Sequence, residues 1–130
     1  MSDAPRIDEL RRRVEADPAS FAFAVLAEEY RKAGCLADAI ATCRAGLARH
    51  PSYHSARTTL GRALAEAGDL EAASEAFEAV LRAAPENLAA QRGLAEVRRR
   101  TAQARQVAAL ERLLASVERR RTAWPAAQAR

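Results

Sequence analysis

The chain has 130 residues, of which 49% are hydrophobic and 5% aromatic, and its formal net charge is +4. A chain of this length forms one compact unit or one short array of repeats. Alanine, leucine, arginine and glutamate dominate, and all four form helices readily, so we expect an all-α protein. No apolar run approaches the roughly 18–20 residues that span a bilayer, and the first ten residues contain no apolar signal core.

Two features of the composition bear on where the protein works. Cys35 and Cys43 have no cluster of histidine or cysteine around them, which indicates neither a disulfide framework nor a zinc site. All but one of the 21 basic residues are arginine, a bias that favours a GC-rich bacterial genome. We therefore expect a bacterial protein of the cytoplasm that needs no cofactor.

The first predicted element is a short helix near the N-terminus. Ile7, Leu10 and Val14 recur at helical spacing, and Pro18 ends the pattern. An array of repeats needs a cap because each repeat buries its apolar face only against its neighbours. We expect residues 1–19 to form this capping helix.

A pattern that recurs after 34 residues organises the middle of the chain. Each copy contains an apolar stripe, a small residue, a turn glycine and a closing proline. The first copy is Phe23, Leu26, Ala27, Tyr30, Gly34, Leu36, Ala39, Cys43, Leu47 and Pro51, and the second is Arg57, Leu60, Gly61, Leu64, Gly68, Leu70, Ala73, Phe77, Leu81 and Pro85. A fixed period of this length is typical of stacked helical repeats.

These residues resemble the tetratricopeptide repeat (TPR) family, closely over about residues 20–87 and partly up to Arg100. Arg57 and Gln91 depart from the bulky apolar residues usual in the family. The resemblance implies a short right-handed α-solenoid with helix-turn-helix repeats at 20–53 and 54–87. We expect the helices of these repeats at about 20–33, 36–49, 54–67 and 70–83.

The repeat pattern fails after residue 87. Asn87 fits as the N-cap of a further helix, but no glycine or proline interrupts the chain between Leu94 and Ala123. Two interpretations remain for residues 88–121: a degenerate, kinked third repeat, or one long helix, which the missing glycine favours. We expect residues 122–130 to form a flexible tail.

In TPR-like arrays the first helix of each repeat lines a concave groove that binds peptides, so the resemblance implies a partner-binding surface. Its positions here are Phe21, Glu28, Arg31, Lys32, Ser55, Thr58, Arg62, Glu66, Arg92, Glu96 and Arg99. Because cations outnumber carboxylates among them, we expect a non-catalytic adaptor or scaffold whose protein or peptide partner has acidic character. The alternative is an ordinary solvated face of mixed charge.

One specialisation of the family is not expected here. Chaperone-binding members hold a C-terminal carboxylate with lysine and asparagine side chains at set places on the first helices. The corresponding residues in this chain are Ala24, Glu28, Thr58 or Thr59, Ala89 and Gly93. None of them matches, so capture of a chaperone tail is disfavoured.

The C-terminal third offers two alternatives to groove binding. A second apolar stripe can pack on the preceding repeat or pair with another chain, which would make the protein a homodimer or an assembly module. The stripe comprises Val107, Leu110, Leu113, Leu114 and Val117. Residues 88–130 also carry ten basic and three acidic side chains, but with a single aromatic and no phosphate-binding loop they make nucleic acid the weaker alternative.

No arrangement of residues indicates catalysis or metal binding. Glu28 and Glu29 are adjacent on a helix and therefore point about 100° apart, with no nucleophile beside them. His50 and His54 lack acidic or thiol ligands nearby in the sequence. We expect no enzymatic activity and no metal.

Overall fold

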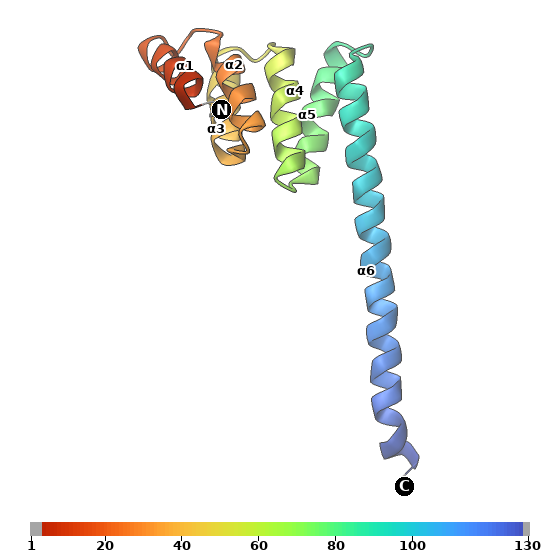
Figure 1. Ribbon diagram of the computed structural model, residues 1–130. Helices are drawn as coiled ribbons and strands as arrows, with labels where there is room; N and C mark the ends of the chain where they lie inside the picture. The colour runs from red at the N-terminus through yellow and green to blue at the C-terminus, as the bar shows by residue number, and fades with distance from the viewer. Residues whose placement is uncertain (1–3, 129–130) are drawn as a thin grey trace. The chain divides into compact units, whose positions relative to one another are not determined.

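The computed structural model describes residues 4–128, and every regular element in this range is an α-helix. The helices are α1 (Ala4–Ala16), α2 (Ala22–Lys32), α3 (Leu36–Arg49), α4 (His54–Glu66), α5 (Leu70–Ala83) and α6 (Leu88–Gln128). Figure 1 shows α2 with α3 and α4 with α5 as two successive helical hairpins. The predicted all-α repeat architecture is confirmed. Among the described residues, no helix is long and apolar enough to cross a membrane.

Each hairpin turns at a glycine in the left-handed region of backbone conformation. Gly34 has φ of 81° and Gly68 has φ of 91°, values that side-chain-bearing residues rarely adopt. After each glycine, the next amide donates a hydrogen bond back to the helix, from Cys35 to the carbonyl of Tyr30 and from Asp69 to that of Leu64, both at 2.9 Å. This pattern closes a helix C-terminus and starts the antiparallel return.

The core of the repeats is built around one phenylalanine per hairpin, each packed against glycine. Phe23 and Phe77 are both 1% exposed. A Cβ atom at Gly61 would lie 2.7 Å from the ring of Phe77, and one at Gly93 would come closer still. Gly46 faces Phe23 in the same way. The two aromatic rings therefore fit only because the facing helix backbones carry no side chain there.

Helix α1 covers the first hairpin. Its buried Ile7 and Leu10 share a cluster with Leu26 and Tyr30 of α2. At the rim of this cluster Arg11 donates a hydrogen bond from Nε to the Tyr30 hydroxyl at 3.0 Å. Apolar surface at the start of the array is thus removed from water, which is the physical task of a terminal cap.

The C-terminal third forms a single helix. The side-chain oxygen of Asn87 accepts a hydrogen bond from the amide of Ala90 at 3.0 Å, as expected for the N-cap of α6. Helix α6 continues to Gln128 without a return at residues 100–102. The chain divides into two compact units, residues 1–97 and 98–130, and the first turns of α6 complete the first unit with Leu94 and Val97 in its core.

The expected C-terminal tail, residues 122–130, lies only partly in the described range. Residues 122–128 continue α6 as helix, through Pro125, and the expected flexibility of this segment stays a prediction. The remaining tail residues, 129–130, lie outside the described part of the chain. The same holds for residues 1–3 of the expected cap.

The fit of Phe77 generates a prediction about stability. Replacing Gly93→Val should lower the free energy of unfolding by about 1–3 kcal/mol, because the added atoms overlap the Phe77 ring in a filled core. The control Ala95→Val adds apolar atoms at an exposed position of the same helix. It should change the free energy of unfolding by less than about 0.5 kcal/mol. Urea denaturation followed by circular dichroism measures both. Equal midpoints for the two variants would contradict this packing.

Candidate partner-binding groove

A groove with a volume of about 510 Å³ lies along α2 and α4 and reaches the start of α6. Five of the residues expected to face a partner line it: Glu28, Lys32, Ser55, Thr58 and Arg62. The other lining residues are Ala24, Val25, Glu29, Tyr53, Thr59, Asn87 and Ala89. The groove therefore combines two whole first helices of the repeats with the beginning of a third.

The helical period explains why these side chains share a surface. On α2, Ala24, Glu28 and Lys32 are four residues apart and so lie above one another on one side. Phe23 and Ala27, which precede two of them, turn toward the core and are 1% and 0% exposed. The buried stripe thus fixes which face of the helix remains for a partner.

One end of the groove is apolar. Val25 is 44% exposed although it is aliphatic, and it lines the groove together with the ring of Tyr53. Tyr53 immediately precedes α4, so the apolar end lies at the N-termini of the two helices. Neither Val25 nor Tyr53 is among the contact residues predicted from the sequence. Their signal was an apolar residue out of register with the buried stripe, and an aromatic residue in the loop that starts the second repeat.

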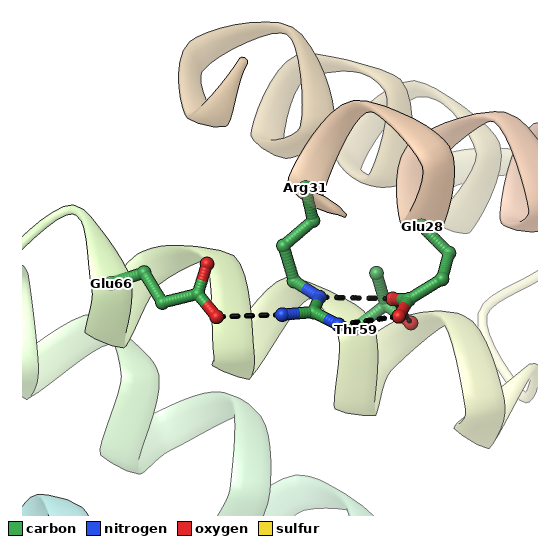
Figure 2. A network of polar contacts seen from close by, with 4 residues as sticks. All are labelled: Glu28, Arg31, Thr59 and Glu66. Carbon is green, nitrogen blue, oxygen red and sulfur yellow. Dashed lines mark hydrogen bonds and ion pairs between the residues drawn. The ribbon is translucent and has the colours of Figure 1, made fainter. Parts of the chain in front are cut away.

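A polar network that includes Glu28 and Thr59 of the groove lining links α2 to α4 (Figure 2). Arg31 donates to both carboxylate oxygens of Glu28, from Nη2 at 2.5 Å and from Nε at 3.0 Å. Its Nη1 donates to Glu66 of α4 at 2.6 Å, and the Thr59 hydroxyl donates to Glu28 at 3.3 Å. One guanidinium group therefore joins carboxylates from two successive repeats.

This network keeps its members charged. Hydrogen bonding to Arg31 lowers the pKa of Glu28, and Arg62 adds a smaller electrostatic contribution in the same direction. The hydrogen bond to Glu28 in turn raises the pKa of Arg31. The Arg31 side chain is only 17% exposed and already faces two carboxylates. Arg31 therefore acts as a structural link between α2 and α4, and the partner contact expected of it from the sequence stays a prediction.

The available cations of the groove are Lys32 and Arg62. Both are exposed, and within the described range no carboxylate forms an ion pair with either of them. Glu29, the remaining acidic residue of the lining, pairs with Arg6 of α1 at 3.5 Å. The charge that the groove offers to a partner is therefore positive.

Other expected contact residues lie elsewhere. Phe21 is 56% exposed, but its ring stacks on His50 at 4.1 Å and meets Tyr53 edge-on at 5.3 Å, beside the groove rather than in it. The Nε2 atom of that histidine is 2.7 Å from the carbonyl oxygen of Ala19. Arg92 and Glu96 are exposed on the first turns of α6 without lining the groove, and Arg99 belongs to the second unit.

The second apolar stripe is exposed in the second unit. Its five side chains have exposed fractions between 48% and 65%: Val107, Leu110, Leu113, Leu114 and Val117. The expected homodimer through this stripe stays a prediction.

The cysteines and histidines form no visible site. Within the described part of the chain, no three His, Cys, Asp or Glu side chains gather as metal ligands. Cys43 is fully buried, and its burial raises the pKa of the thiol to about 12. At neutral pH this thiol is therefore protonated and packs as a small apolar group. Cys35 is exposed.

Comparison with known proteins agrees with the fold. A family model described as tetratricopeptide repeat matches residues 30–97. The chain therefore belongs to the TPR family, and the predicted resemblance is confirmed. A search among curated proteins finds no match.

Several solved TPR domains are similar to this chain. The first TPR of Spaghetti (RPAP3), bound to the HSP90 peptide SRMEEVD, is 28% identical, with a TM-score of 0.71 over 74% of this chain and 77% of that one. The second TPR domain of human RPAP3, in complex with the HSP70 peptide SGPTIEEVD, is 29% identical, with a TM-score of 0.68 over 71% and 78%. The Sgt2 TPR domain from Aspergillus fumigatus is 25% identical, with a TM-score of 0.72 over 77% and 68%.

The lowered pKa of Glu28 generates a prediction about acid stability. Replacing Glu28→Gln should reduce the free energy of unfolding at pH 7 by about 1 kcal/mol, because Arg31 loses a charged partner. A carboxyl group with a lowered pKa in the folded state stabilises the fold above its ordinary value of 4.5. That contribution is lost as the pH falls through the folded-state pKa. The gap between wild type and variant should therefore close below about pH 4.

Urea titrations at a series of pH values measure this gap. Glu75→Gln is the control, because Glu75 is exposed on α5 and makes no ion pair within the described range. It should leave the pH profile of stability unchanged. A gap between wild type and Glu28→Gln that stays constant down to pH 3 would contradict the network's contribution.

Proposed function

We propose that this protein is a non-catalytic adaptor that binds an acidic segment of a partner protein in the groove along α2 and α4. The observation that carries the proposal is the pair of exposed cations, Lys32 and Arg62, in a groove of about 510 Å³ whose other charged groups already have partners. Carboxylate side chains of a partner would form charge-assisted hydrogen bonds with these two groups.

The similar TPR domains support acidic character in the partner. The peptides bound to the two RPAP3 domains, SRMEEVD and SGPTIEEVD, both end in Glu-Glu-Val-Asp. We transfer from them the general chemistry, an acidic peptide held by a TPR domain, and not the identity of the peptide.

The way in which this groove would hold its partner differs from capture of a chain terminus. Glu28 places a carboxylate within the groove lining, where chaperone-binding members of the family have a residue that attracts one. Ala24 and Ala89 supply no donor side chain. Acidic side chains inside a partner segment, rather than its terminal carboxylate, are therefore the proposed contacts at Lys32 and Arg62.

The apolar end of the groove would orient the segment. Val25 and Tyr53 offer a surface for one apolar side chain of the partner. The network of Arg31, Glu28 and Glu66 holds α2 and α4 in place before any partner arrives. A groove organised in advance leaves most of the ordering cost of binding to the peptide.

Selection from a displayed peptide library tests the proposal. Peptides that bind the full chain should carry several Asp or Glu residues and one large apolar residue. Their affinity should fall at least about 30-fold for Lys32→Glu/Arg62→Glu, since two attractive contacts become repulsive. Their affinity for the wild-type chain should also fall with rising salt.

A second double charge-reversal variant distinguishes the effect of the groove residues from the effect of overall net charge. Arg44→Glu/Arg82→Glu makes the same change in net charge at exposed positions of α3 and α5, outside the groove lining. It should change affinity by less than about threefold, an effect of long-range charge alone. Enrichment of neutral or basic peptides, or equal losses for the two double variants, would refute groove binding.

The terminal carboxylate of a partner generates a separate prediction. Because Glu28 lies in the groove, amidation of the peptide SGPTIEEVD at its C-terminus should change its affinity for this chain by less than about twofold. Isothermal titration of the free-acid and amidated peptides measures the difference. A loss of tenfold or more on amidation would mean that the groove captures chain termini after all.

A further inference from the structure

The second unit of the chain presents a continuous apolar surface on one side of α6. To the exposed stripe between Val107 and Val117 the structure adds Trp124, which is the only tryptophan of the chain and is 65% exposed. Trp124 follows Val117 by seven residues, or two helical turns, and so lies on the same side of the helix. Surfaces of this kind on water-soluble domains mark contact sites.

A shallow hollow of about 530 Å³ lies at the C-terminal end of this surface. Val117, Arg120, Arg121 and Trp124 line it, at the spacing i, i+3, i+4, i+7 of a single helix face. Arg121 pairs with Glu118 at 3.7 Å, but both side chains are well exposed, so a stronger anion can replace this carboxylate. Two guanidinium groups therefore border a floor of valine and indole. A phosphate group attached to hydrocarbon satisfies both parts of this hollow.

The opposite side of the helix is basic. The basic residues on this side are Arg105, Arg112 and Arg119. Each is two positions along the chain from a stripe residue (Val107, Leu110 and Val117, respectively), and two helical residues turn through about 200°. Residues 105–124 contain five arginines and two glutamates, a net charge of +3. This charge repels a second copy of the same segment, and a nucleic acid would leave the stripe in water. An anionic surface with an apolar interior covers the stripe, and its potential attracts the basic side of the helix at longer range.

We propose that the segment of α6 between Arg105 and Trp124 binds to the surface of anionic phospholipid membranes. The helix lies in the plane of the interface, with the stripe at the boundary between headgroups and acyl chains. Arg120 and Arg121 contact lipid phosphates, and Trp124 sits at headgroup depth, where tryptophan is enriched. A helix with one basic and one apolar face binds in this way without spanning the bilayer. The proposal does not depend on the function of the groove.

Trp124 reports directly on the proposed contact. The full chain is mixed with vesicles of phosphatidylglycerol and phosphatidylcholine in a one-to-three ratio, or with phosphatidylcholine alone. The anionic vesicles should sediment the protein and shift the tryptophan emission to shorter wavelength. The affinity for the anionic vesicles should exceed that for neutral ones by at least about tenfold and should fall with rising salt.

Two matched pairs of variants test whether the stripe and the hollow, rather than the overall composition of the helix, determine binding to the vesicles. Leu110→Gln/Leu114→Gln should weaken binding at least about tenfold, whereas Ala108→Gln/Ala115→Gln, on the other side of the helix, should change it less than about twofold. Arg120→Gln/Arg121→Gln should weaken binding about 30-fold, and Arg112→Gln/Arg119→Gln, with the same loss of charge, less than about fivefold. Far-ultraviolet circular dichroism confirms that each variant remains helical.

Three outcomes would overturn the proposal. The first is equal binding to neutral and anionic vesicles, or binding without a shift of the Trp124 emission. The second is equal loss within either matched pair, which would show that general charge or composition, and not one face, decides the affinity. The third is a wild-type dimer in sedimentation equilibrium that ignores vesicles and dissociates in Leu110→Gln/Leu114→Gln, because the stripe would then be covered by a second copy.

Discussion

The fit of Phe77 between two glycines is the constraint on which the first unit depends. Its ring is almost fully buried, and the backbones of α4 and α6 approach it at Gly61 and Gly93, where any side chain would overlap it. Three successive helices are thereby packed at close range around one side chain. Since α4 and the start of α6 supply half of the candidate groove, the shape of that groove follows from this contact in the core. The candidate groove thus lies on the outer side of helices whose spacing is set by the packing around Phe77.

The polar network around Arg31 explains why the groove offers less charge than its sequence contains. A guanidinium group that already faces two carboxylates at 2.5 and 2.6 Å has little to gain from a third. Its contribution is instead to hold α2 against α4 across the repeat boundary. Glu28 stays ionised, but Arg31 compensates its charge, so Lys32 and Arg62 decide the sign of the surface. Arg31 therefore contributes rigidity, while the proposed contacts with a partner belong to Lys32, the next residue of α2, and to Arg62 of α4.

Most of the fold could be predicted from the sequence, because each repeat contains residues that end its helices. The glycines at 34 and 68 and the prolines at 51 and 85 mark the ends of helices, and the expected ranges agree with α2 to α5 within two residues.

The groove was predicted less completely than the fold. Helical periodicity identifies the outward face of each helix, hence Glu28 and Arg62, but it does not predict ion pairs between side chains of α2 and α4. The packing of Phe21 beside the groove could not be predicted for a related reason, since its stacking on His50 joins residues 29 positions apart.

The role of an arginine side chain in this protein depends on the groups that surround it. By composition Arg31, Arg62 and Arg120 are equivalent, yet the first is held by two carboxylates, the second is exposed in a polar groove, and the third borders an exposed indole. Two carboxylates within hydrogen-bonding distance make a guanidinium a structural link, and open water beside polar neighbours makes it a contact for acidic side chains. An adjacent apolar floor favours phosphates that carry hydrocarbon, because only such a ligand satisfies the charge and covers the floor together. The excess of positive charge in this chain therefore does not predict a single kind of partner. The surroundings of Lys32 and Arg62 favour the proposed acidic segment, and those of Arg120 favour the proposed lipid phosphates.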